Sequence, residues 1–199
     1  LLAVERVVLN LIMRMSGVAT FTRKIVDILK DYDVLITPTR KMLWGLLDKR
    51  AVLVGGGGTH RINLTDAVLV KDTHLDLIGH DFNLLFERLT SSGVDGRFVE
   101  IEVDSVVEAL LVAKMFNEAI KAKRMRSIGV LLMDNMSSGQ ISEAMEEIKR
   151  QGLYEGLLFE ASGGINEKNV VEYAATGVDI VSMGCLTNGA RSLNMSMKI

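Results

Sequence analysis

Apolar positions along this chain change from helical spacing to short continuous runs. The opening segment places its apolar side chains three or four positions apart, from Val4 to Val18. This spacing predicts an amphipathic helix. Ser16-Gly17 is expected to bend that helix before a second helical stretch from Phe21 to Tyr32.

After this opening, runs rich in Val, Ile and Leu alternate with helical patterns. Near-continuous apolar runs are typical of parallel strands that are covered on both faces. The predicted strands are 34–39, 51–55, 67–71, 98–104, 127–134, 156–161 and 178–184. The predicted helices between the later strands are 81–92, 105–123, 140–151 and 166–176. Ser105 and Asn166 are predicted N-caps, and Gly152 and Gly177 are predicted to end helices.

The alternation predicts an α/β fold built from right-handed crossovers. A complete eight-unit barrel takes about 250 residues, whereas this chain has 199, including the leading helix. We therefore expect one domain over 1–199, an incomplete six- or seven-stranded α/β barrel with a leading N-terminal helix. A doubly wound open sheet is the alternative, because it also gathers its strand ends along one edge.

Composition narrows the class of protein further. A net charge of −2 gives no sign of a nucleic-acid surface, and no apolar stretch approaches the roughly 20 residues of a membrane span. The single cysteine, Cys185, excludes an internal disulfide framework and suits a reducing, cytoplasmic compartment. The chain opens on Leu-Leu inside a helical pattern, so we expect a preceding segment to be missing.

Chemically active residues stand at the ends of the predicted strands. In a parallel barrel these ends share one rim, so the residues are expected to converge on one pocket. The early ends bring cations, the middle ends bring carboxylates and the late ends bring glycine-rich backbone. In that order they are Thr39, Arg40, Lys41, His60, Arg61 and Lys71, then Glu102, Asp104 and Asp134, then Ser162, Gly163, Gly164 and Gly184. This order predicts a site for a polyanionic substrate, a divalent metal and a phosphate.

Two of the cationic positions have a purely structural alternative. The glycines at 55–58 permit close approach of backbone to a ligand, or they form a flexible turn. His60, which follows them, is either a ligand-binding group or a histidine with its hydrogen bonds satisfied inside the fold. Lys71 either reaches the pocket or pairs with Asp72 and caps its strand.

The acids and the late glycines suggest where a metal and a phosphate bind. Glu100, Glu102 and Asp104 alternate along one strand and therefore share one face, which is costly inside a barrel unless cations compensate. Asp134 is a natural oxygen ligand for Mg²⁺ or a ribose hydroxyl. Ser162-Gly163-Gly164 leads into a predicted helix, which favours a phosphate site. Cys185 is expected to be a small buried residue rather than a nucleophile.

These residues resemble one known family in order along essentially the whole chain. The matching motifs are ERVVLNLIMRMSGVAT, TRK, GGGGTHRINLTDAVLVKDTH, EIEVD, LMDNM, EASGGINEKNVVEYAATGVDIVSMG and LNMSMKI. With them the chain resembles quinolinate phosphoribosyltransferase, the carboxylating nicotinate-nucleotide pyrophosphorylase. The resemblance implies an incomplete barrel that follows an N-terminal sandwich domain, which is absent from these residues.

The resemblance also implies an activity and roles for particular residues. The family transfers phosphoribosyl from phosphoribosyl pyrophosphate to quinolinate, releases pyrophosphate and CO₂, uses Mg²⁺, and forms homodimers or higher homo-oligomers. Arg6 matches the arginine offered across the dimer, and the cations from Arg40 to Lys71 match the quinolinate pocket. Glu102 and Asp134 match the acids at the ribose and metal, and with Lys41 and Lys71 they form the expected catalytic set. The expected 5′-phosphate loops hold Ser162, Gly163, Gly164, Gly184, Cys185 and Leu186.

Several positions depart from the family pattern and leave rival functions open. The departures are Pro38, Met42, Thr59, Thr73 and Asn188. Two alternative functions therefore remain open. The first is a divergent paralogue, either linked to molybdenum transport or using nicotinate. The second is a non-catalytic module that binds phosphate ligands.

Overall fold

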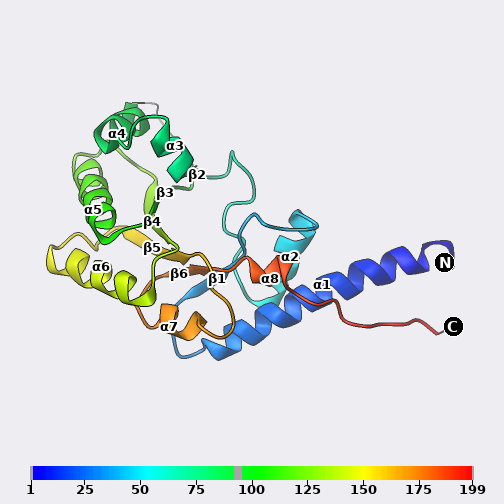
Figure 1. The fold of residues 1–199 in the computed structure, drawn as a ribbon. Helices are drawn as coiled ribbons and strands as arrows, with labels where there is room; N and C mark the ends of the chain where they lie inside the picture. Colours follow the sequence, from blue (N-terminus) through cyan, green and yellow to red (C-terminus); the bar gives the residue numbers. More distant parts are fainter. Residues whose placement is uncertain (1, 92–95, 199) are drawn as a thin grey trace.

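The computed structural model describes residues 2–91 and 96–198. It begins with α1 (Leu2–Ile28), a single helix that runs through Ser16-Gly17, so the two helical stretches expected from the sequence are one element. Figure 1 shows α1 projecting from the body with the C-terminal segment beside it. Leu193 N–H donates to the Met13 carbonyl across this contact. A side chain at Gly17 would meet the Arg191 carbonyl, so glycine is required here for close packing rather than for a bend.

Six parallel strands form one open sheet. They are β1 (Leu35–Thr37), β2 (Val68–Val70), β3 (Phe98–Val103), β4 (Ile128–Asp134), β5 (Leu157–Ser162) and β6 (Ile180–Ser182). Their spatial order is β1-β6-β5-β4-β3-β2, so from β2 to β6 each strand pairs with the next in sequence, and β6 pairs with β1. This is the cyclic order of a barrel that stays open between β1 and β2, and it rules out the doubly wound alternative, whose order reverses at a switch point.

Helices cover the outer face of this curved sheet. Figure 1 shows α4 (Phe82–Ser91), α5 (Val106–Lys121), α6 (Ser138–Arg150) and α7 (Val170–Ala174) around the strands. Three further helices are α2 (Leu46–Gly55), α3 (Asp72–Asp76) and α8 (Cys185–Asn188). Ile101, Leu131 and Phe159 come from adjacent strands and are fully buried in the core. Within the described ranges, no helix has the length and apolar character needed to cross a bilayer.

The strand predicted at 51–55 is wrong, because these residues close helix α2. Ala51, Val52 and Gly55 are buried whereas Leu53 and Val54 are exposed, which is the spacing of a helix face. A short apolar run cannot be distinguished from a buried helix segment by periodicity alone. Gly56 then ends α2 in the left-handed conformation, with φ of 99°.

Three of the four predicted helix ends are confirmed. The Ser105 side chain accepts from Glu108 N–H at the start of α5, and Gly152 and Gly177 have positive φ just after α6 and α7. The helix predicted at 166–176 is shorter than expected. Asn166 caps only the turn at 167–169, through the Lys168 N–H, and α7 itself starts at Val170.

Candidate active site

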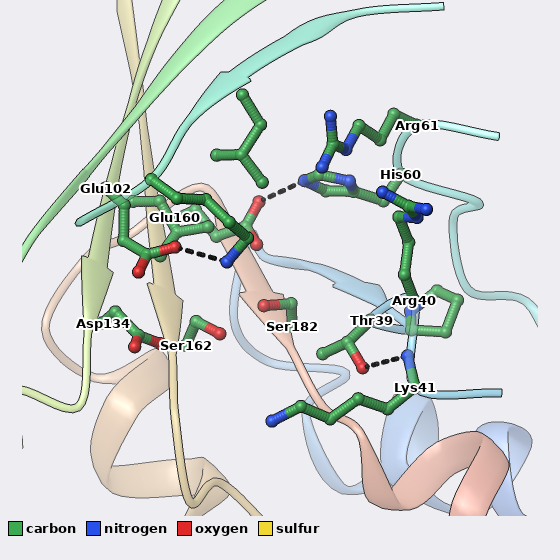
Figure 2. A pocket seen from close by; sticks show the side chains of 14 residues that line it. Thr39, Arg40, Lys41, His60, Arg61, Glu102, Asp134, Glu160, Ser162 and Ser182 are labelled. Atoms are coloured by element: carbon green, nitrogen blue, oxygen red, sulfur yellow. Dashed lines mark hydrogen bonds and ion pairs between the residues drawn. The ribbon is translucent and has the colours of Figure 1, made fainter. Parts of the chain in front are cut away.

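A cavity of about 330 Å³ opens where the strands end, and we call it the main cavity (Figure 2). Strand register explains its make-up: Asp134 lies opposite Ser162 across β4 and β5, and Thr37 lies opposite Ser182 across β1 and β6. The cavity is lined by Pro38, Thr39, Arg40, Lys41, His60, Arg61, Leu69, Lys71, Glu102, Leu132, Asp134, Glu160, Ser162 and Ser182. The convergence predicted from the sequence is thus present in the structure.

Cations occupy one side of the main cavity. Figure 2 shows Arg40, His60 and Arg61 on the side opposite Glu102, with Glu160 in contact with the His60 ring. Arg61 is only 5% exposed, and among residues 2–91 and 96–198 no carboxylate forms an ion pair with it, Arg40 or Lys41. Burial and the charge of Arg40 lower the pKa of Arg61 below its usual value. A buried guanidinium without a carboxylate ion pair suits an anionic ligand, because the charge of Glu100 offsets only part of its desolvation.

Behind these cations, His60 contacts two buried carboxylates. Its Nε2 lies 3.2 Å from Glu100 Oε2 and 3.2 Å from Glu160 Oε2. Burial disfavours the charged ring, but the hydrogen bonds to Glu100 and Glu160 outweigh it and raise the pKa of His60 to about 10. The two interpretations of His60 are therefore compatible: its Nε2 has carboxylate partners within the fold, and the ring lines the cavity.

Lys49 on α2 supports the segment that carries His60. Its Nζ donates to the carbonyls of Thr59 and Arg61, each at 2.5 Å, on either side of the histidine. His60 itself has a φ of 51°, a conformation that only a held backbone maintains in a non-glycine residue. Burial, together with the charges of Arg40 and Arg61, lowers the pKa of Lys49 to about 8. This lysine therefore shapes the cavity from outside it.

Carboxylates form the opposite wall. Glu102 Oε2 accepts from Lys71 Nζ at 2.8 Å, so Lys71 reaches the cavity and pairs with Glu102, contrary to the alternative of a pair with Asp72. Asp134 Oδ2 accepts from Asn135 Nδ2 at 2.6 Å. The two acids also share a neighbouring acid-rich hollow of about 220 Å³ with Asp104. Two carboxylates at adjacent strand ends fit the oxygen ligands that Mg²⁺ takes together with substrate phosphates.

A second cavity, which we call the glycine-rich cavity, adjoins the first and has a volume of about 310 Å³. It is lined by Thr39, Lys41, Ser162, Gly163, Gly164, Ile165, Asn166, Ser182, Gly184, Cys185 and Asn188. Gly163 and Gly164 have φ of 92° and 64°, which glycine adopts readily. Because α7 starts only at Val170, the loop after β5 rather than the start of α7 lines this cavity, and the other side holds Gly184, the N-cap of α8.

Two predicted site residues lie away from both cavities. Arg6 is exposed on the projecting part of α1. Leu186 is fully buried in the core, and its N–H donates to the Met183 carbonyl. Cys185 does line the glycine-rich cavity, and burial raises the pKa of its thiol, which disfavours the nucleophilic thiolate.

Sequence reasoning missed Glu160 and Lys49. Glu160 stands inside the apolar run LLFEAS, and an acid in a buried strand is itself a signal of function. Lys49 gave no such signal, because the sequence Asp48-Lys49-Arg50 resembles an exposed helix face. Of the departures noted above, Pro38 lines the main cavity and Asn188 lines the glycine-rich one.

Comparison with known proteins decides the family. Residues 18–198 match the sequence profile described as "Quinolinate phosphoribosyl transferase, C-terminal domain". The chain belongs to this family. It aligns over its full length, at 36% identity, with a probable carboxylating nicotinate-nucleotide pyrophosphorylase of Methanothermobacter thermautotrophicus, and at 34% with one of Archaeoglobus fulgidus. These alignments cover 68% and 73% of the two relatives.

Solved structures of the family have the same fold. The nicotinate-nucleotide pyrophosphorylase of Ehrlichia chaffeensis matches with a TM-score of 0.80 at 35% identity, over 98% of this chain and 65% of that one. NadC from Streptococcus pyogenes matches with a TM-score of 0.83 at 32% identity, over 99% of this chain and 64% of that one. The chain thus spans less than two thirds of these solved proteins.

Proposed function

We propose that this family member transfers phosphoribosyl from phosphoribosyl pyrophosphate to quinolinate, with loss of CO₂, to give nicotinate mononucleotide for NAD synthesis. The observation that carries the proposal is the group of cations without carboxylate partners, Arg40, Lys41 and Arg61, facing Glu102 across one cavity. The curated relatives bear the name of this activity.

The acceptor would lie among the cations. Quinolinate carries two carboxylates, and Arg40, His60 and Arg61 offer guanidinium and imidazolium donors to them. Leu69 and Leu132 supply apolar surface for the ring in the same cavity. When the 2-carboxylate leaves as CO₂, its bonding electrons stay on the ring, and cations already in place stabilise them without reorganisation.

The donor would lie between the two cavities. Gly163, Gly164 and Gly184 place backbone near the 5′-phosphate, and Ser162 and Lys41 line both cavities. Loss of pyrophosphate leaves a cation-like ribosyl carbon, which Glu102 would stabilise while Lys71 holds that carboxylate in place. Glu102 and Asp134 would hold Mg²⁺, whose chemistry is to neutralise the charge of the leaving pyrophosphate. Catalysis then rests on positioning and electrostatics.

A second copy of the chain is part of the proposal. Arg6 is exposed on α1, and the neighbouring Val4, Val7 and Val8 on this helix are 54%, 62% and 45% exposed. A homodimer would cover this surface and bring Arg6 to the quinolinate of the other subunit. The proposed compartment is the cytoplasm, where a lone Cys185 stays reduced.

The test compares acceptors with the longest natural form of the protein. We expect Mg²⁺-dependent formation of nicotinate mononucleotide from quinolinate and phosphoribosyl pyrophosphate, with nicotinate inactive as acceptor. Product from nicotinate would assign the protein to a neighbouring transferase. Binding without product from either acceptor would favour the divergent paralogue or the non-catalytic module.

A further inference from the structure

His60, Glu100 and Glu160 form a buried cluster that the proposed reaction does not use in full. The ligand-type atoms of these three side chains all lie within 4.8 Å of one another. Glu100 is 0% and Glu160 is 1% exposed, and both His60 and Glu160 line the main cavity. Figure 2 shows Glu160 extending from its strand to the His60 ring. We call this cluster the His60 triad.

Strand geometry brings the two acids together. Glu100 on β3 pairs with Val130 on β4, and Glu160 on β5 pairs with Leu132, so the acids flank the same strand. Glu100 Oε2 and Glu160 Oε2 have no hydrogen-bond partner of good geometry among the described residues; their nearest cation is His60 Nε2. Two buried carboxylates at such a distance need positive charge nearby.

The charged groups around the triad favour a proton on His60 over a bound metal. They are Arg40 after β1, Lys49 on α2, Arg61 and Asp66 in the segment before β2, Lys71 after β2, Arg97 before β3, Glu102 at the end of β3 and Asp134 at the end of β4. A carboxylate–imidazole set also ligates transition metals. However, a divalent ion would have to displace the proton from His60 and meet the charges of Arg61 and Lys49. A proton on His60 adds one positive charge instead of two and displaces nothing.

We propose that Glu100 and Glu160 are positioning residues that hold the His60 ring in place and keep it an imidazolium, so that it presents a fixed positive charge to the acceptor carboxylate. Glu100 lies outside the lining of the main cavity, and Glu160 Oε2 lies 3.2 Å from His60 Nε2. Both acids act through His60, whose ring faces the cavity. Burial and the neighbouring Glu160 raise the pKa of Glu100 to about 7. The proposal rests on the proposed function for the identity of the acceptor, quinolinate.

The direct test is the protonation state of His60 in the wild-type protein. The chain has three histidines, so the His60 ring can be assigned in nitrogen NMR spectra by comparison with His60→Gln. We expect an imidazolium signal that persists to at least pH 9. A His60 ring that is neutral at pH 7.5 would overturn the proposal. This measurement needs no turnover, so it stays informative if quinolinate proves not to be the acceptor.

The kinetic test uses glutamine, which keeps the shape of glutamate and removes its charge. In the Glu100→Gln/Glu160→Gln double variant, His60 loses both anionic partners and remains desolvated, so it becomes neutral above about pH 6. We expect the KM for quinolinate to rise roughly tenfold to a hundredfold at pH 8 and to recover toward pH 6. The KM for phosphoribosyl pyrophosphate should change less than about twofold.

Controls separate this role from a structural one. Glu147→Gln removes an acid paired with Arg150 on the surface of α6 and should leave both KM values unchanged. In a His60→Gln background, the double substitution should add no further loss of quinolinate affinity. An equal rise in KM at pH 6 and pH 8, or additive losses in that background, would show that the acids act independently of the His60 charge and would contradict the proposal. If the double variant does not fold, Glu160→Gln alone must still lower the pH at which the His60 ring deprotonates.

Discussion

Lys49, Arg61 and His60 are buried cations, and at the residue scale each has a different role. Arg61 is left without a carboxylate partner in the described chain, which suits an incoming anion. His60 is held by two acids. Lys49 faces backbone carbonyls instead of the cavity and fixes the segment that carries the other two. Lys49 therefore positions the ligand-binding cations without lining the cavity itself.

Replacing Lys49 by Met tests this organising role. Met preserves most of the side-chain volume but leaves the carbonyls of Thr59 and Arg61 without their donor. We expect the free energy of unfolding to fall by about 2–4 kcal/mol and the KM for quinolinate to rise. Chemical denaturation and steady-state kinetics measure both. Arg50→Met, on the exposed side of α2, is the matched control and should change neither; a Lys49→Met protein that behaves like it would contradict this role.

The sequence predicts the residues that line the cavity better than the residues that hold them in position. Arg40, Lys71 and Asp134 follow apolar runs, so their position at the rim could be read from the pattern. Lys49 and Glu160 could not be assigned in this way. Lys49 acts on carbonyls 10 and 12 positions along the chain, and Glu160 acts on His60, 100 positions before it. A charged side chain in a helix pattern looks solvated until its burial is known.

At the element scale, the turn after β5 is the most constrained part of the glycine-rich cavity. Gly163 and Gly164 both have positive φ, but their surroundings differ. A Cβ at Gly163 would collide with the side chain and backbone of Asn135, whereas a Cβ at Gly164 would meet nothing within 4 Å. The loop after β5 is thus packed against the loop after β4, which carries Asp134.

Alanine at these two positions forms a matched pair. Both substitutions strain a left-handed backbone, at about 1 kcal/mol each. Only Gly163→Ala also forces the loop away from Asn135, so we expect it to raise the KM for phosphoribosyl pyrophosphate at least tenfold more than Gly164→Ala does. Steady-state kinetics on both variants check this. Equal effects would mean that the packing against Asn135 does not shape the phosphate site.

Helices and strands were predictable where the length of the apolar pattern and the residues at its ends indicated the same type of element. The long runs at β3, β4 and β5 and the capped helix α5 were expected nearly to the residue. Helix α2 was not, because its apolar half, 51–55, is the length of a strand and its first half gives no capping signal. Secondary structure this short is decided by what packs on it, here α1, and sequence pattern alone does not contain that contact.

At the scale of the whole molecule, the barrel is left open between β1 and β2. This opening forms the site, and the charges buried there affect the stability of the fold. The segment with His60 and Arg61 occupies the gap, so cations enter where a closed barrel would have backbone pairs. The buried charges make stability depend on pH. The folded protein keeps a proton on His60 up to a pKa of about 10, whereas the unfolded chain releases it near 6.5.

The sign of that dependence follows from the raised pKa. The stabilisation from protonated His60 is complete below about pH 6.5 and is lost as pH rises toward 10. Between pH 7 and pH 9 we expect the wild-type protein to lose on the order of 2 kcal/mol more unfolding free energy than the Glu100→Gln/Glu160→Gln variant. The lowered pKa of Lys49 acts in the opposite direction, and more so in the variant, because the charge of Glu160 raises that pKa in the wild type. Denaturation at the two pH values measures the difference, and parallel curves would contradict it.

The central claim is that one cavity performs transfer and decarboxylation on the same acceptor. The most direct measurement supplies quinolinate labelled in its 2-carboxylate and follows labelled CO₂, pyrophosphate and nicotinate mononucleotide together. We predict that all three form in equal amounts, and only when phosphoribosyl pyrophosphate and Mg²⁺ are both present. Pyrophosphate without CO₂, or CO₂ without phosphoribosyl pyrophosphate, would contradict the account.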